Sequence, residues 1–125
     1  GEIESPTIEA NVVETEALIL LSDVSDKREY SEGELKVFLY DISLKYGQDY
    51  HEMEATIQGE SGFNSLAVGD DGLSVGISQF TLLTYLEFCE PKDNRLDPLK
   101  SMDCMGKMFQ MGLQSRWTIW RNLYQ

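Results

Sequence analysis

The sequence is poor in basic residues and has no long apolar run. Its 125 residues hold 10 Lys and Arg against 22 Asp and Glu, so its formal net charge at pH 7 is −12. A chain this acidic repels phosphate backbones and anionic lipid surfaces, so we expect no nucleic-acid partner. The longest apolar run, residues 17–21, is far shorter than the roughly 18–20 residues of a membrane span. We therefore expect no membrane span in this chain.

Cysteine and histidine are also scarce. The only histidine, His51, lies in the first turn of a predicted helix, where we expect a surface residue. The two cysteines, Cys89 and Cys104, fit no metal motif. A bridge between them would close a loop of about 15 residues and contribute roughly 3 kcal/mol, but the sequence leaves their pairing open. Asp70 and Asp71 lack the acidic spacing of a calcium loop, so we expect neither a metal nor an organic cofactor.

The acidic residues are concentrated at the start of the chain. Residues 1–33 contain 9 acidic and 2 basic residues, whereas residues 34–125 contain 13 and 8. We interpret residues 1–30 as an acidic arm and residues 31–125 as one domain. Within the arm, apolar residues recur at helical spacing, which indicates an amphipathic helix through Val13, Ala17, Leu20 and Val24.

Cap-like residues and apolar spacing predict a domain that is all α-helical or nearly so. Ser31 and Glu34 form a capping box, and Gly47 is a natural stop. Asp49 begins a second helix, and Asp97 followed by Pro98 begins a longer one. Five glycines between residues 59 and 79 indicate loops, with a short hairpin within residues 66–78. The predicted helices cover about residues 31–46, 49–61, 82–89, 99–111 and 116–124.

Glu60 is the most informative carboxylate of the sequence. Met53, Ile57 and Glu60 follow the spacing i, i+4 and i+7, so they share one stripe of the second helix. A carboxylate at the end of an apolar stripe is partly desolvated, which raises its pKa and suits a general acid. The alternative is a solvated glutamate at a fraying helix end.

The residues around Glu60 form a recognisable pattern. The chain reads Glu60-Ser61-Gly62-Phe63-Asn64 and later Gly76-Ile77-Ser78-Gln79-Phe80. Over about residues 46–80 it resembles the soluble lytic transglycosylase family and its goose-type lysozyme relatives, which have a Glu-Ser pair followed by an aromatic and Asn, then Gly-x-x-Gln. The resemblance implies a lysozyme-like helical domain that cleaves the β-1,4 bond between N-acetylmuramic acid and N-acetylglucosamine in peptidoglycan.

The resemblance also assigns roles to residues. Glu60 would protonate the glycosidic oxygen and then accept a proton from the muramic C6 hydroxyl, which closes a 1,6-anhydro ring without water. Ser61 would orient Glu60, while Gly76 and Gln79 would line the sugar subsites. We expect Phe63 and Phe80 in the core.

The C-terminal part departs from the family pattern. The family's later Ala-Tyr-Asn motif, whose tyrosine reaches the catalytic glutamate, is absent, and residues 116–124 occupy about its place. Trp120 or Tyr124 could supply the aromatic side chain of a sugar subsite, although aromatic residues at helical spacing are more often core residues.

The sequence suggests three alternatives to a transglycosylase, of which two stay open. Asp70 or Asp71 could act as the second carboxylate of a hydrolytic lysozyme (muramidase). The strong negative charge, which is unusual for an enzyme of the anionic cell wall, leaves room for an inactive glycan-binding or assembly module. Gly72-Leu73-Ser74-Val75-Gly76 matches a serine nucleophile elbow, but no histidine follows it, so we reject a serine hydrolase.

A peptidoglycan-cleaving domain implies a place outside the cytoplasm. We expect a monomer that acts on glycan strands in the periplasm, at the cell surface or after secretion, or that is delivered by a phage. No basic region precedes the apolar run as in a signal peptide, so we expect any export or anchor segment to be missing from this chain.

Overall fold

The computed structural model describes residues 29–125, so the predicted helix through Val13, Ala17, Leu20 and Val24 lies outside the described residues. This described part is mostly helical and contains one small antiparallel sheet. None of its helices is long and apolar enough to cross a membrane. Its α-helices are α2 (Glu32–Tyr46), α3 (Tyr50–Ser61), α4 (Leu82–Phe88), α5 (Pro98–Gln110) and α6 (Thr118–Tyr124).

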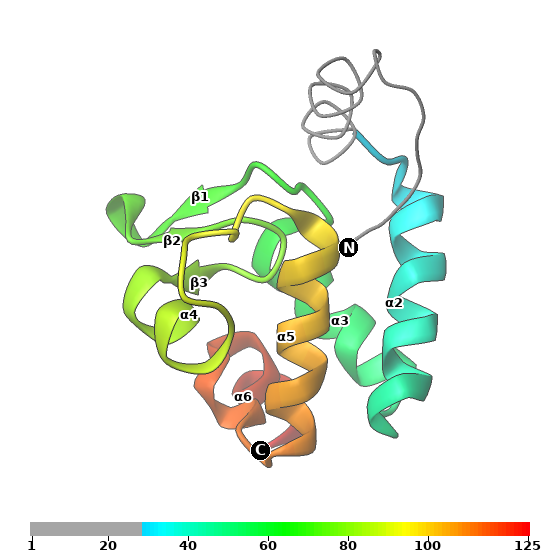
Figure 1. Ribbon diagram of the computed structural model, residues 1–125. Coiled ribbons are helices and arrows are strands. Elements are labelled where there is room, and N and C mark those ends of the chain that lie inside the picture. The colour runs from blue at the N-terminus through cyan, green and yellow to red at the C-terminus, as the bar shows by residue number, and fades with distance from the viewer. Residues whose placement is uncertain (1–28) are drawn as a thin grey trace.

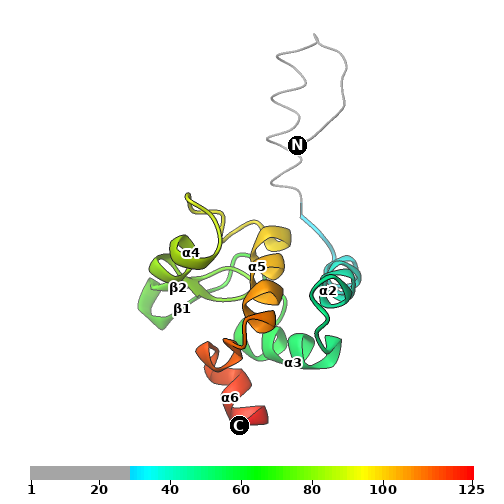
Figure 2. The same ribbon diagram turned by 60° about the horizontal axis from the view of Figure 1, so that its bottom comes forward.

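Helix α5 lies in the middle of the fold. In Figures 1 and 2 it stands between α2 on one side and the sheet with α4 on the other. Helix α2 packs on α5 and α3, and α3 packs on α6. Much of the core around α5 consists of fully buried methionines, whose unbranched side chains fill irregular gaps: Met53, Met102, Met105 and Met108.

The predicted helix ends are confirmed at four places. Ser31 and Glu34 form the reciprocal hydrogen bonds of a capping box, and Gly47 ends α2 in the left-handed conformation. The Asp49 side chain accepts from two backbone amides at the start of α3. Asp97 does the same for α5, with Pro98 in its first turn. These ends were predictable because each depends on residues next to one another in the chain.

The last helix begins later than predicted. Residues Gln114–Arg116 form a short 3₁₀ helix, η2, and Trp117 is extended, so α6 starts at Thr118 and not at Arg116. Trp117 is 5 % exposed and its indole Nε1 donates to the carbonyl oxygen of Ser78 at 2.8 Å. This long-range anchor places a break where the local spacing of apolar residues indicates continuous helix.

A three-stranded sheet follows α3. Strand β1 (Val68–Gly69) pairs with β2 (Ser74–Val75), which pairs with β3 (Phe80–Thr81), and both pairings are antiparallel. A 3₁₀ turn, η1 (Asp70–Gly72), joins β1 to β2. The predicted hairpin within residues 66–78 is confirmed, while β3 was not predicted because two residues show no alternation. Phe63 and Phe80 are buried core residues, as predicted.

A disulfide joins Cys89, at the C-terminal end of α4, to Cys104 in α5. It settles the pairing that the sequence left open. Because the polar loop of residues 90–97 connects the same two helices, the bridge closes this loop and holds α4 against the central helix. Helix α4 has seven residues, too few to be stable alone.

We predict that the disulfide contributes about 3 kcal/mol to the free energy of unfolding, the value expected for a 15-residue loop. The double variant Cys89→Ser, Cys104→Ser should lose about that amount in urea unfolding followed by circular dichroism. Reduction of the wild type should have the same effect, and a reductant should leave the double variant unchanged. Two reactive thiols in the unfolded, unreduced wild type would contradict the bridge.

Candidate active site

Glu60 lies in the last turn of α3 and opens onto a cleft of about 160 Å³. Three parts of the fold meet there. The sheet, together with η1, contributes Asp70, Ser74, Gln79, Phe80 and Thr81, helix α4 contributes Thr84, and the C-terminal segment contributes Arg116, Trp117 and Thr118. The lining is mainly polar, and its two aromatic side chains, Phe80 and Trp117, are almost fully buried.

The surroundings of Glu60 favour its neutral form. Burial raises the pKa of Glu60, because the half-buried carboxylate loses water that would stabilise its charge. The nearby backbone of Ile119 lowers this pKa, the negative charge of Asp70 raises it, and the positive charge of Arg121 lowers it. The net shift is upward, so the carboxyl group keeps its proton to a higher pH than an exposed glutamate. Such a group can serve as a general acid.

Gln79 is held rigidly in the sheet wall of the cleft. Its backbone is left-handed, with φ +54°, which is costly for a residue with a side chain. Its side-chain Nε2 donates to the carbonyl oxygens of Ala67 at 3.0 Å and Gly76 at 2.9 Å. These two bonds fix the amide plane, and Oε1 packs against Gly69, where an added Cβ would lie 2.5 Å from it.

The two aspartates of η1 are placed differently. Asp70 lines the cleft, and its Oδ2 accepts a hydrogen bond from the Ser74 hydroxyl at 2.6 Å. Asp71 is exposed and does not line the cleft. Of the two candidate second carboxylates, the structure therefore brings only Asp70 next to the space that Glu60 faces.

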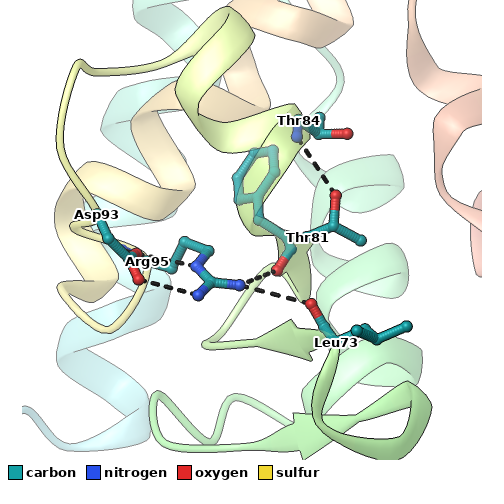
Figure 3. Close-up of polar contacts among 6 residues, drawn as sticks. Leu73, Thr81, Thr84, Asp93 and Arg95 are labelled. Atoms are coloured by element: carbon teal, nitrogen blue, oxygen red, sulfur yellow. Dashed lines mark hydrogen bonds and ion pairs between the residues drawn. The ribbon is translucent and has the colours of Figure 1, made fainter.

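Arg95 ties the loop after α4 to the sheet. Its guanidinium donates to both carboxylate oxygens of Asp93, at 2.8 and 2.9 Å, and to the carbonyl oxygen of Phe80 at 3.1 Å (Figure 3). A longer bond of 3.5 Å reaches the carbonyl oxygen of Leu73. The Arg95 side chain is only 12 % exposed, so these are sheltered charge-assisted bonds. They hold β3 and the start of β2, which form one wall of the cleft.

Gly76 packs against the backbone of the loop that contains Arg95. We expected this glycine to leave room for a sugar, but the structure fills that room with the chain itself. An added Cβ at Gly76 would overlap the backbone carbonyl of Arg95, and its φ of +89° is unfavourable for other residues. Gly76 does not line the cleft, so it supports the wall through close backbone packing and does not form a subsite.

The other predicted site residues, Ser61, Trp120 and Tyr124, do not line the cleft. The Ser61 hydroxyl donates to the carbonyl oxygen of Ile77 at 2.7 Å, so it joins α3 to the loop before β3. The Trp120 indole donates to Glu52 at 2.8 Å, and the Tyr124 ring packs on Trp120. The structure does not bring Trp120 or Tyr124 to the cleft.

Trp117 is the aromatic residue that the C-terminal segment brings to the cleft. We did not single it out from the sequence. Trp117 and Trp120 are three residues apart, so in a continuous helix they would share one face. The break before α6 places the two side chains in different surroundings.

Comparison with known proteins finds no matching family model, no matching curated protein and no matching solved structure. The resemblance to lytic transglycosylases therefore depends on the quoted motifs alone. In residues 29–125, no three His, Cys, Asp or Glu side chains gather in a way that would hold a metal ion.

We predict that Gly76→Ala lowers the free energy of unfolding by more than about 2 kcal/mol, because it combines an unfavourable φ with a backbone clash. Gly72→Ala is a matched control. Its φ is +93°, but nothing lies within 4 Å of the added methyl group, so only the conformational cost of about 1 kcal/mol applies. Urea unfolding of both variants measures the difference. Equal losses would show that the loop does not press on Gly76.

Proposed function

We propose that this domain is a peptidoglycan lytic transglycosylase with a lysozyme-like fold and that Glu60 is its acid and base. The observation that carries the proposal is the place of Glu60: a half-buried carboxyl group with a raised pKa, at the end of a helix, facing a polar cleft. The ordered motif from Glu60 to Gln79 supports the same class of reaction.

The chemistry follows from one group that changes its protonation state. Neutral Glu60 gives its proton to the glycosidic oxygen as the bond to the muramic C1 breaks, and positive charge develops on that sugar ring. The Glu60 carboxylate then takes the proton of the C6 hydroxyl while that oxygen bonds to C1. The products are a free 4-hydroxyl on the departing sugar and a 1,6-anhydro ring, and Glu60 is neutral again.

The cleft lining suits a glycan. Thr81, Thr84 and Thr118 offer hydroxyl groups, and Gln79 also lines the cleft. Phe80 and Trp117 also line the cleft, but both are almost fully buried, so they support its wall. The disulfide is consistent with an oxidising compartment, which supports the expected place of action outside the cytoplasm.

Glu60→Gln should reduce the release of soluble fragments from purified sacculi by a factor of about 10² to 10⁴, because an amide has no acidic proton to transfer. The wild-type products should carry 1,6-anhydro ends, which mass spectrometry detects as fragments one water lighter than hydrolytic ones. Asp41→Asn removes an exposed carboxylate from α2, a helix outside the cleft, and should leave the rate unchanged. Equal rates for Glu60→Gln and the wild type would contradict the proposal, and binding without measurable cleavage by the wild type would favour an inactive glycan-binding module.

A hydrolytic muramidase is the second candidate, and the position of Asp70 favours it. Asp70 shares the cleft with Glu60 and raises the pKa of Glu60 through its charge, so the two carboxylates are electrostatically linked. In an inverting glycosidase the second carboxylate activates the attacking water. The hydrogen bond from Ser74 uses one oxygen of Asp70 and leaves the other available.

Asp70→Asn separates the two reactions. For the transglycosylase that we propose, the variant should still form 1,6-anhydro products, because the C6 hydroxyl is the nucleophile. For a hydrolase, the rate should fall by a factor of about 10² or more and the wild-type products should have reducing ends. Mass spectrometry of sacculus digests by both proteins gives the answer.

A further inference from the structure

The Ile119 side chain lies against Gly59, so that a side chain at position 59 would clash with it. Gly59 precedes Glu60 in α3, and Ile119 lies in the first turn of α6. A Cβ added at Gly59 would lie 2.6 Å from Cγ2 of Ile119 and 3.1 Å from its Cδ1. The isoleucine side chain therefore occupies the space that any residue other than glycine would need for its own side chain.

This contact brings backbone amides close to Glu60. The first amides of an α-helix have no partner within the helix, and the residue before α6, Trp117, caps none of them with its side chain. The backbone of Ile119, in this turn, lies close enough to the Glu60 carboxylate to lower its pKa, and the preceding residue Thr118 lines the same cleft as Glu60. Trp117 anchors the residue before α6 through its bond to the carbonyl oxygen of Ser78.

We propose that Gly59 and Ile119 are positioning residues: the missing side chain at Gly59 lets the first turn of α6 close on Glu60, and the Ile119 amide holds the carboxylate toward the cleft. The proposal deepens the proposed function, on which it rests for the role of Glu60 as the acid.

The Ile119 backbone also limits how strongly burial favours the neutral form of Glu60. A donor to the carboxylate stabilises the ionised state, which Glu60 must reach after it has given up its proton. The other charged groups facing Glu60 are Asp70 from η1, Arg116 in the cleft lining and Arg121 from α6. Arg121 is itself tied to Ser115 and Thr118, so it belongs to the same segment.

The sharpest test replaces the amide of residue 119 by an ester, through incorporation of the α-hydroxy analogue of isoleucine. This removes one N–H and keeps the side chain. The pKa of Glu60, followed by carboxyl-carbon NMR during a pH titration, should rise by about one unit, because a hydrogen bond to a charged group is lost. Gly59→Ala should act in the same direction by pushing Ile119 away. Ile119→Val keeps the N–H and should leave the pKa close to the wild-type value.

An unchanged Glu60 pKa in the ester variant, with the wild-type near-ultraviolet circular dichroism, would overturn the proposal. If Gly59→Ala does not fold, the ester variant carries the test alone. The titration needs no substrate, so it separates this proposal from the proposed function. A shifted pKa in a protein inactive on sacculi would support the positioning and refute the enzyme, whereas an unshifted pKa in an active protein would do the reverse. In an active enzyme, the pH optimum should move upward with the pKa.

Discussion

Partial removal of the Glu60 carboxyl group from water is the constraint on which the site depends. A charged carboxylate prefers water, so the fold must either keep this group neutral or supply a donor for it. Here both occur, because burial favours the neutral form and the backbone of Ile119 supports the ionised one. A group held between these two states can give and take a proton in one reaction cycle.

The two walls beside Glu60 are held by interactions of different kinds. The sheet wall consists of strands of two residues each, which are too short to be stable alone. The loop of residues 90–97 stabilises these short strands. The Arg95 side chain donates to a carbonyl oxygen of the sheet, and the Arg95 backbone packs on Gly76. The α6 wall depends on the buried Trp117 and on the close approach at Gly59.

The motif resemblance and the tertiary structure cover different parts of the cleft. The motif spans about residues 46–80, which in the structure are α3 and most of the sheet. It ends before the segment that faces them, where the chain brings Trp117 and the Ile119 backbone to Glu60. Backbone groups leave no residue type to recognise in a sequence, which is one reason why this wall was not predicted.

The sequence alone determined the helices with clear caps, the glycine-rich turn region and the acid at the end of an apolar stripe. Each depends on neighbouring residues or on a helical repeat, so local rules suffice. Only the tertiary structure decided that Gly76 packs against Arg95, that Trp117 and not Trp120 lines the cleft, and that Cys89 pairs with Cys104. These facts depend on contacts between segments far apart in the chain, where packing space and hydrogen-bond partners come from residues that no local pattern relates.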